Sequence, residues 1–209
     1  MIESSIALDE LERDALTELV NIGVSRAAAS LRKMVHKQVI LSVPSVEIVT
    51  RQSAASLIGQ RESERLVAVQ QQFEGPFSGR ALLIFPESNG LSLVRAIVGD
   101  EMLEAEVLDI EEEALAETGN VILNGCLGSM ANMLQHTLKT SLPNVCRGDS
   151  GLLFGDANEE GFVLFLYINF SVRERDIRGY IAMIMDLPSL ERLKQLIADF
   201  IDRVMKEIK

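Results

Sequence analysis

DALTELVN, residues 14–21, is the stretch from which the rest of the chain is best interpreted. Asp14, Glu18 and Asn21 are spaced i, i+4 and i+7, which places three polar side chains along one side of a helix. An apolar stripe with the spacing of a helix runs beside them, made of Leu8, Leu11, Ala15, Leu19 and Ile22. The stretch therefore predicts an amphipathic helix over residues 8–22, with a separate polar strip.

The same pattern occurs a second time. Glu113, Glu117 and Asn120 each lie 99 positions after their counterparts in the first stretch. Beyond each asparagine, 22 residues precede a proline, Pro44 in the first case and Pro143 in the second. Four matches at one offset, in segments that both have a helical pattern, predict an internal duplication.

Composition limits the classes of protein that fit. A chain of 209 residues can bury roughly 70% of its unfolded surface, so it needs no structural metal or disulfide. A net charge of −11 argues against nucleic acid or an anionic membrane as a partner and permits a partner with a basic face. The acidic start MIESSIALDE has no apolar region typical of a signal peptide, and no run approaches the length of a membrane span. We expect a cytoplasmic protein in which Cys126 and Cys146 are neutral thiols.

Periodicity predicts the same series of elements in each half. The first half should contain helices over 8–22 and 24–35 separated at Gly23, a strand over 37–50 interrupted by Pro44, a short helix over 52–59, strands over 66–73 and 79–85 forming a hairpin, and a helix over 91–98. The second half should contain helices over 107–121 and 127–138 separated at Asn124-Gly125, an extended stretch with Pro143, strands over 161–170 and 178–187 forming a hairpin, and a helix from about Pro188.

These elements predict an α/β fold of the α+β kind. Hairpins give a mostly antiparallel sheet, which long helices should cover. No linker rich in Pro, Gly or Ser separates the halves. We therefore expect one pseudo-twofold domain over residues 1–209, made of half-repeats at about 8–99 and 107–208.

Carboxylates on a helix surface are usually only a solvated face, and a single ExxN pattern often arises by chance. Two copies, each followed by a proline at the same distance, make a functional interpretation more favourable. The pattern D/S-x3-E-x2-N-x22-P resembles the signature of the CheC/CheX/FliY family of chemotaxis phosphatases. The two copies in about 200 residues resemble the two-site CheC branch, and ELVNIGVSRAAASL is similar to that family's helix pair.

The resemblance implies hydrolysis of the aspartyl-phosphate on a CheY-like receiver domain. Asn21 and Asn120 would each place a water in line with phosphorus, since a side-chain amide donates and accepts hydrogen bonds without adding charge. Glu18 and Glu117 would each pair with a receiver lysine on docking. The protein would need no cofactor of its own, because the receiver supplies Mg²⁺.

The remaining signature positions are expected to support the site. Asp14 fits the pattern, whereas Glu113 stands where the family has Asp or Ser. If this position only caps or supports the helix, little is lost; if it orients the Glu–Asn pair, the second site is in doubt. We expect the first site to carry more activity, because Asp14 fits the family pattern and Glu113 does not. Pro44 and Pro143 are expected to bend the strand beside each helix.

An alternative class of function stays open. The same fold could be a non-catalytic interaction module, such as a flagellar-switch component or a regulator that binds the receptor deamidase CheD. Intact Glu–Asn pairs in both halves favour catalysis. Metal and nucleotide sites have no support, because His36 and His136 lack ligand-type neighbours and no phosphate-binding glycine motif occurs. The sequence does not identify the receiver, the faster site, a CheD-like partner or the oligomeric state.

Overall fold

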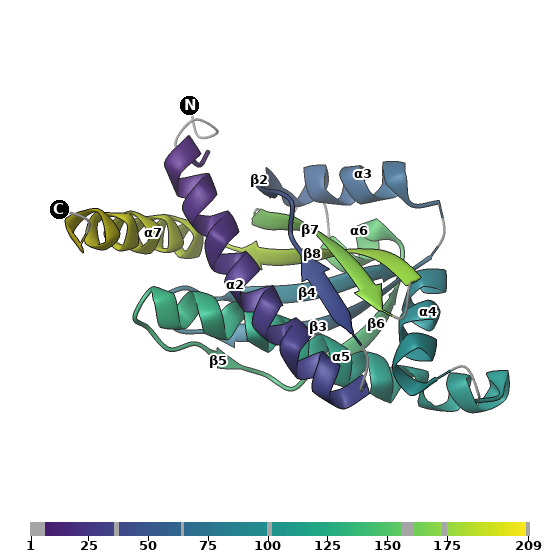
Figure 1. The fold of residues 1–209 in the computed structure, drawn as a ribbon. Coiled ribbons are helices and arrows are strands. Elements are labelled where there is room, and N and C mark those ends of the chain that lie inside the picture. The colour runs from purple at the N-terminus through teal and green to yellow at the C-terminus, as the bar shows by residue number, and fades with distance from the viewer. Residues whose placement is uncertain are drawn as a thin grey trace.

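The computed structural model describes residues 7–35, 38–63, 65–99, 102–155, 161–172 and 175–207. The first half contains α2 (Glu10–Val35), β1 (Val39–Ser42), β2 (Val46–Thr50), α3 (Arg51–Arg61), β3 (Leu66–Glu74), β4 (Gly79–Pro86) and α4 (Glu87–Val98). The second half contains α5 (Glu104–Met133), β5 (Lys139–Thr140), β6 (Asn144–Gly148), α6 (Ser150–Phe154), β7 (Phe162–Val172), β8 (Arg175–Met185) and α7 (Leu187–Glu207). The order helix, two strands, helix, two strands, helix thus occurs twice (Figure 1).

All eight strands form one antiparallel sheet, as predicted. The strand order is β1-β7-β8-β4-β3-β5, with β2 also pairing with β7 and β6 also pairing with β3. The first two strands of each half therefore pair with a hairpin strand of the other half. The α+β class and the duplicated element order are confirmed, whereas the organisation as a single domain made of two half-repeats stays a prediction.

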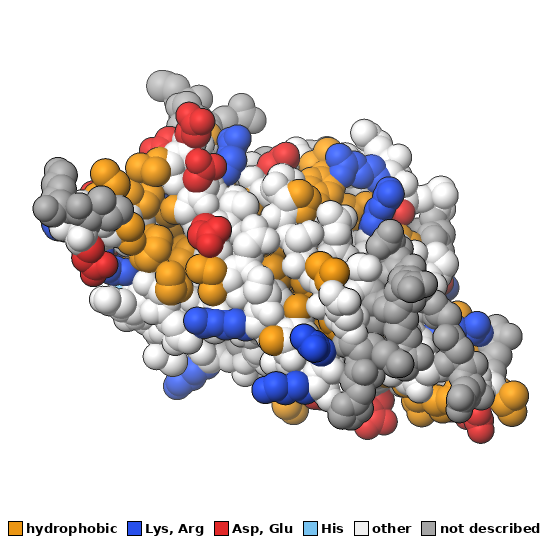
Figure 2. Space-filling model, in the orientation of Figure 1, with side chains coloured by type: hydrophobic (Ala, Val, Ile, Leu, Met, Phe, Trp, Pro, Cys, Tyr) orange, Lys and Arg blue, Asp and Glu red, His pale blue; other side chains and the backbone are white. Residues whose placement is uncertain are grey.

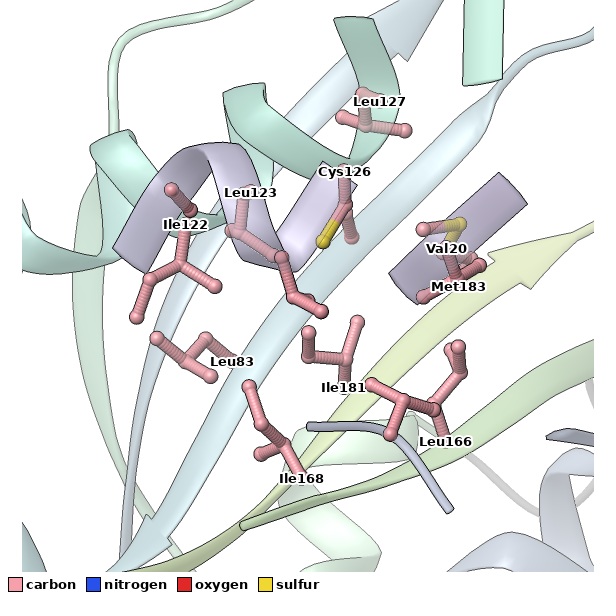
Figure 3. Packing of buried hydrophobic residues seen from close by; sticks show 14 of the residues in the cluster. Val20, Leu83, Ile122, Leu123, Cys126, Leu127, Leu166, Ile168, Ile181 and Met183 are labelled. Atoms are coloured by element: carbon pink, nitrogen blue, oxygen red, sulfur yellow. The ribbon is translucent and has the colours of Figure 1, made fainter. Parts of the chain in front are cut away.

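Alternate side chains of the central strands feed two cores on opposite faces of the sheet. On one face, α2, α4, α5 and α7 cover the larger core. On the other face, α3 and α6 cover a smaller core that contains Ile58, Leu153 and Phe154. Figure 3 shows side chains of the two long helices, among them Val20 and Leu123, meeting sheet residues such as Leu83 and Ile181. The period of two along each strand produces this division.

The two long helices are each continuous, so the predicted breaks at Gly23 and at Asn124-Gly125 are wrong. A Cβ atom added to Gly23 would lie 2.8 Å from Cys126 Cα and 2.8 Å from the carbonyl oxygen of Gly125. A Cβ on Gly125 would lie 2.9 Å from Ala27 Cβ. These glycines allow α2 and α5 to cross at close range, rather than ending either helix. The predicted second helix also ends early, at Met133.

The start of α2 is fixed by local sequence. The backbone N–H of Glu12 donates to Asp9 Oδ1 at 2.8 Å, and the backbone N–H of Asp9 donates to Glu12 Oε2 at 3.0 Å. This reciprocal cap satisfies two N–H groups that the first turn leaves without partners. None of the helices in the described parts of the chain combines the length and apolarity that crossing a membrane requires.

Candidate functional site

The first copy of the motif lies on α2. Asp14 and Glu18 are exposed, and Asn21 is half-buried. Glu18 and Asn21 line a surface hollow of about 410 Å³, together with Ile22, Ser25, Arg26 and Ala29. The helix therefore places a carboxylate and an amide of the predicted site in one shared depression.

The amide of Asn21 holds the chain between β1 and β2. Its Nδ2 donates to the carbonyl oxygen of Val43 at 3.0 Å, and its Oδ1 accepts from the N–H of Val43 at 3.0 Å. Val43 is buried and directly precedes the exposed Pro44, which lies between the two strands as expected. This pair of hydrogen bonds gives the Asn-x22-Pro spacing a structural basis. One N–H and one lone pair of the amide remain for another partner.

The second copy lies on α5 and has different partners. Glu113 and Glu117 are exposed, and Asn120 is half-buried. Asn120 Oδ1 accepts from Gln71 Nε2 at 3.0 Å and from Asn124 Nδ2 at 2.7 Å. Asn120 Nδ2 has no hydrogen-bond acceptor among the residues that the structure describes. Pro143, between β5 and β6, occupies the place of Pro44 but is half-buried.

The four predicted carboxylates are uncommitted within the described part of the chain. Asp14, Glu18, Glu113 and Glu117 form no side-chain hydrogen bond or ion pair with another described residue. Each Glu lies about one helical turn before its Asn, but among the described residues no hydrogen bond or ion pair joins Asp14 or Glu113 to either Glu–Asn pair. An exposed carboxylate without a partner is available to a docked protein.

Charge changes sign along α2. The exposed acidic side chains lie toward its N-terminal half, whereas exposed Arg26, Arg32 and Lys33 lie toward its C-terminal end. Figure 2 shows this face, with acidic side chains over the upper part of α2 and basic side chains near its lower end. Arg26 Nη1 donates to Ser129 Oγ of α5 at 3.3 Å. Glu18 and Arg26 therefore place opposite charges on either side of Asn21.

Other reactive side chains lie away from this surface. Burial raises the pKa of the Cys126 thiol to about 12. Burial also raises the pKa of Cys146, partly opposed by the charge of Arg80. Within the described ranges, no three His, Cys, Asp or Glu side chains are grouped closely enough to bind a metal. His36 lies outside the described residues.

Sequence reasoning missed three residues around the asparagines: Val43, Gln71 and Asn124. Asn124 was visible as a neighbour one turn after Asn120, but it was assigned to a helix break. Gln71 sits in the polar run QQQ of an otherwise apolar strand, and that contrast is the signal that singles it out. Val43 carries no side-chain signal, because its backbone makes the contact.

Comparison with known protein families and sequences finds a match that includes the first motif. The model of the CheC-like family matches residues 11–48, which include the first motif from Asp14 to Pro44. The CheY-P phosphatase CheC of Bacillus subtilis is 20% identical over 196 residues, covering 89% of this chain and 93% of the relative. The flagellar motor switch phosphatase FliY of the same organism is 27% identical over 140 residues, covering 66% of this chain but only 36% of the relative.

A solved structure extends the likeness to the whole fold. The crystal structure of Thermotoga maritima FliY superimposes with a TM-score of 0.70 at 18% identity, covering 92% of this chain and 98% of that chain. At this identity the match concerns the fold, which is the same antiparallel sheet with long helices. Taken together, the family match over the first motif, the nearly full-length similarity to CheC and the shared fold make this chain similar to the CheC-like family.

Proposed function

We propose that this protein is a phosphatase that hydrolyses the aspartyl-phosphate of a CheY-like receiver domain. The observation that carries the proposal is the repeated pair on the two long helices: an exposed, uncommitted Glu and, one turn later, a half-buried Asn held by hydrogen bonds. CheC and FliY, which bear phosphatase names, are similar to this chain and support the same reaction class.

The reaction requires a water to be placed rather than strongly activated. The water oxygen attacks phosphorus as the bond between phosphorus and the aspartyl oxygen breaks. The aspartyl group leaves as a carboxylate, and the phosphoryl group leaves as dihydrogen phosphate, which carries both protons of the water. Asn21 or Asn120 would hold the attacking water through the amide groups that their protein contacts leave available. An amide adds no negative charge beside the phosphoryl oxygens.

Glu18 and Glu117 would fix the partner in place. Each carboxylate is exposed and free of described partners, so pairing with a receiver lysine breaks no existing contact. The Mg²⁺ that neutralises the phosphoryl oxygens would belong to the receiver. The roles of the two side-chain types therefore differ: Glu acts on docking, and Asn acts mainly in the transition state.

This division of roles gives the test. Asn21→Ala and Asn120→Ala should each lower the turnover of a purified phospho-receiver and leave receiver affinity nearly unchanged, and the double variant should abolish acceleration. Glu18→Ala and Glu117→Ala should also weaken binding. Asn132→Ala changes an exposed Asn elsewhere on α5 and is the matched control. Full activity in the double Asn variant would refute the assignment of catalysis to Asn21 and Asn120.

Asn21→Ala needs a stability measurement beside the activity. Losing the amide leaves the N–H and carbonyl groups of buried Val43 without these partners, at a cost of about 1–3 kcal/mol. Turnover should therefore be measured well below the unfolding midpoint of each variant. Comparison of the two single Asn variants then reports the relative activity of the two sites.

The second candidate is an interaction module without catalysis. It is favoured by the engagement of Asn21 with the backbone of Val43, which gives that residue a structural reason to be present. The two candidates separate in one measurement, because a module would bind the phosphorylated receiver and protect its phosphate, whereas a phosphatase shortens its lifetime.

A further inference from the structure

Gln71 is a buried amide in the larger core face of β3. Its side chain is only 1% exposed, and it lies on the strand between apolar Val69 and Phe73, which point to the same face. Its Nε2 donates to Asn120 Oδ1 at 3.0 Å and to the carbonyl oxygen of Ser141 at 2.9 Å. Gln71 therefore links the asparagine of the second motif to the segment that leads to Pro143.

The backbone carbonyl of Ser141 sets the direction of the whole network. A carbonyl oxygen only accepts, so the Gln71 atom that faces it must be the donor Nε2. The Asn120 atom bound to the same Nε2 must then be the acceptor Oδ1, and the Asn124 atom bound to that oxygen must be a donor. Asn120 Nδ2 is thereby left as the end of the amide that is available to another partner.

Gln71 also costs stability where it lies. Its Oε1 is buried and has no hydrogen-bond partner among the described residues, a situation that typically costs about 1–3 kcal/mol. At the equivalent strand position, the second half of the chain has an apolar residue. Ser141 lies opposite Gln72. Ser42, which is 99 positions before Ser141, lies opposite Asn169. Asn169 is therefore the counterpart of Gln72, and the preceding residue, Ile168, is the counterpart of Gln71. Figure 3 shows Ile168 in the apolar core.

We propose that Gln71 is a positioning residue of the second site, which turns the Asn120 amide so that its NH₂ group faces the phosphoryl group and the attacking water. This inference rests on the proposed function and extends it. An amide rotated by half a turn would present its oxygen to negatively charged phosphoryl oxygens, so a fixed orientation has direct value for the reaction. Gln71 therefore lowers the stability of the fold but fixes the orientation of the Asn120 amide for the reaction.

The first site fixes its amide in another way. Backbone groups of Val43 hold both ends of the Asn21 amide, and the counterpart of Asn124 is exposed Ser25. The two motifs therefore share the Glu–Asn pair but not its support. Gln71 should matter to the second site alone.

The test isolates the second site and then removes the donor. Glu18→Arg, at an exposed position, silences docking at the first site and serves as the background. In this background, Gln71→Met keeps nearly the same volume and loses both hydrogen bonds. We expect kcat for phospho-receiver hydrolysis to fall at least tenfold, with KM within about twofold and an unfolding midpoint at least as high as that of the background protein. Gln72→Met, at the neighbouring exposed Gln of the same strand, should leave kcat unchanged.

Gln71→Glu supplies a second variant of similar size. Its ionised carboxylate only accepts, so it should turn Asn120 the other way and lower kcat; protonation at lower pH restores a donor, and kcat should rise relative to the background protein. Normal kcat in both Gln71 variants, while Asn120→Ala in the same background is inactive, would overturn this inference and leave the proposed function standing. Normal kcat in Asn120→Ala would overturn the catalytic role of Asn120 and this inference with it.

Discussion

The crossing of the two long helices allows a stringent test of how glycine is used in this fold. Gly23→Ala would place a methyl group 2.8 Å from two backbone atoms of α5, whereas favourable contacts between heavy atoms lie near 3.5–4.0 Å. The helices must then separate locally by about 0.7 Å or more. Overpacking of this kind costs about 1–3 kcal/mol.

Gly128→Ala is the matched control on α5. A Cβ at Gly128 meets nothing within 4 Å, so this substitution should only gain helix propensity, about 1 kcal/mol. Because both substitutions share that gain, the difference between them isolates the steric cost of the crossing. Gly128→Ala should therefore exceed Gly23→Ala by about 1–3 kcal/mol in the free energy of unfolding.

Urea unfolding followed by circular dichroism would measure both variants against the unsubstituted protein. Equal slopes with shifted midpoints would assign the change to stability. Gly125→Ala, which would meet Ala27 Cβ at 2.9 Å, should resemble Gly23→Ala. If Gly23→Ala stabilises the protein as much as Gly128→Ala does, the helices are not held at the distance described, and the explanation of the continuous helices is wrong.

Two further predictions concern pH and salt. Burial raises the pKa of the Cys126 thiol from 9.0 to about 12, so above pH 9 the thiol ionises in the unfolded state but not in the folded state. The free energy of unfolding should therefore be unaffected below pH 9 and fall above it by about 1.4 kcal/mol per pH unit. Cys126→Ala should remove this part of the pH dependence in urea unfolding measured from pH 7 to 10. Identical slopes in the two proteins would contradict it. Association with a receiver that presents a basic rim should slow as salt rises, and Glu18→Gln with Glu117→Gln should weaken that dependence in stopped-flow measurements. Rates that do not change with salt would count against docking through these carboxylates.

Much of the fold followed from local pattern. The hairpins and the helix from Leu187 were predictable because each element records its own burial in its periodicity. The predicted apolar stripe of α2 was partly wrong, because Leu11 is 55% exposed whereas Leu16, Val20 and Val24 are buried. The short helix α6 was missed, although it lies 99 positions after the start of α3. Five residues carry too little periodicity, and only the repeat offset would have indicated it.

The errors come from contacts between distant segments. Gly23 and Gly125 look like helix ends in sequence, because glycine commonly ends helices; their actual role depends on a partner helix about 100 residues away. The motif carboxylates were placed on the exposed face by helical spacing alone. Val43 and Gln71 lay beyond such reasoning, since sheet register decides which backbone group or strand residue meets each asparagine.

The pairing of β1 and β2 with β7, and of β5 and β6 with β3, means that neither half can complete its own sheet. The arrangement resembles a domain-swapped dimer in which each half donates two edge strands to the sheet of the other, but here both halves belong to one polypeptide. Two separate half-length chains would have to find each other at their cellular concentration, whereas a covalent connection raises the effective concentration of each half for the other to the order of millimolar. The covalent connection therefore makes the pairing of the two halves independent of protein concentration, and the predicted duplication would allow the two sites to differ in their supporting residues, as they do at Gln71 and Ile168.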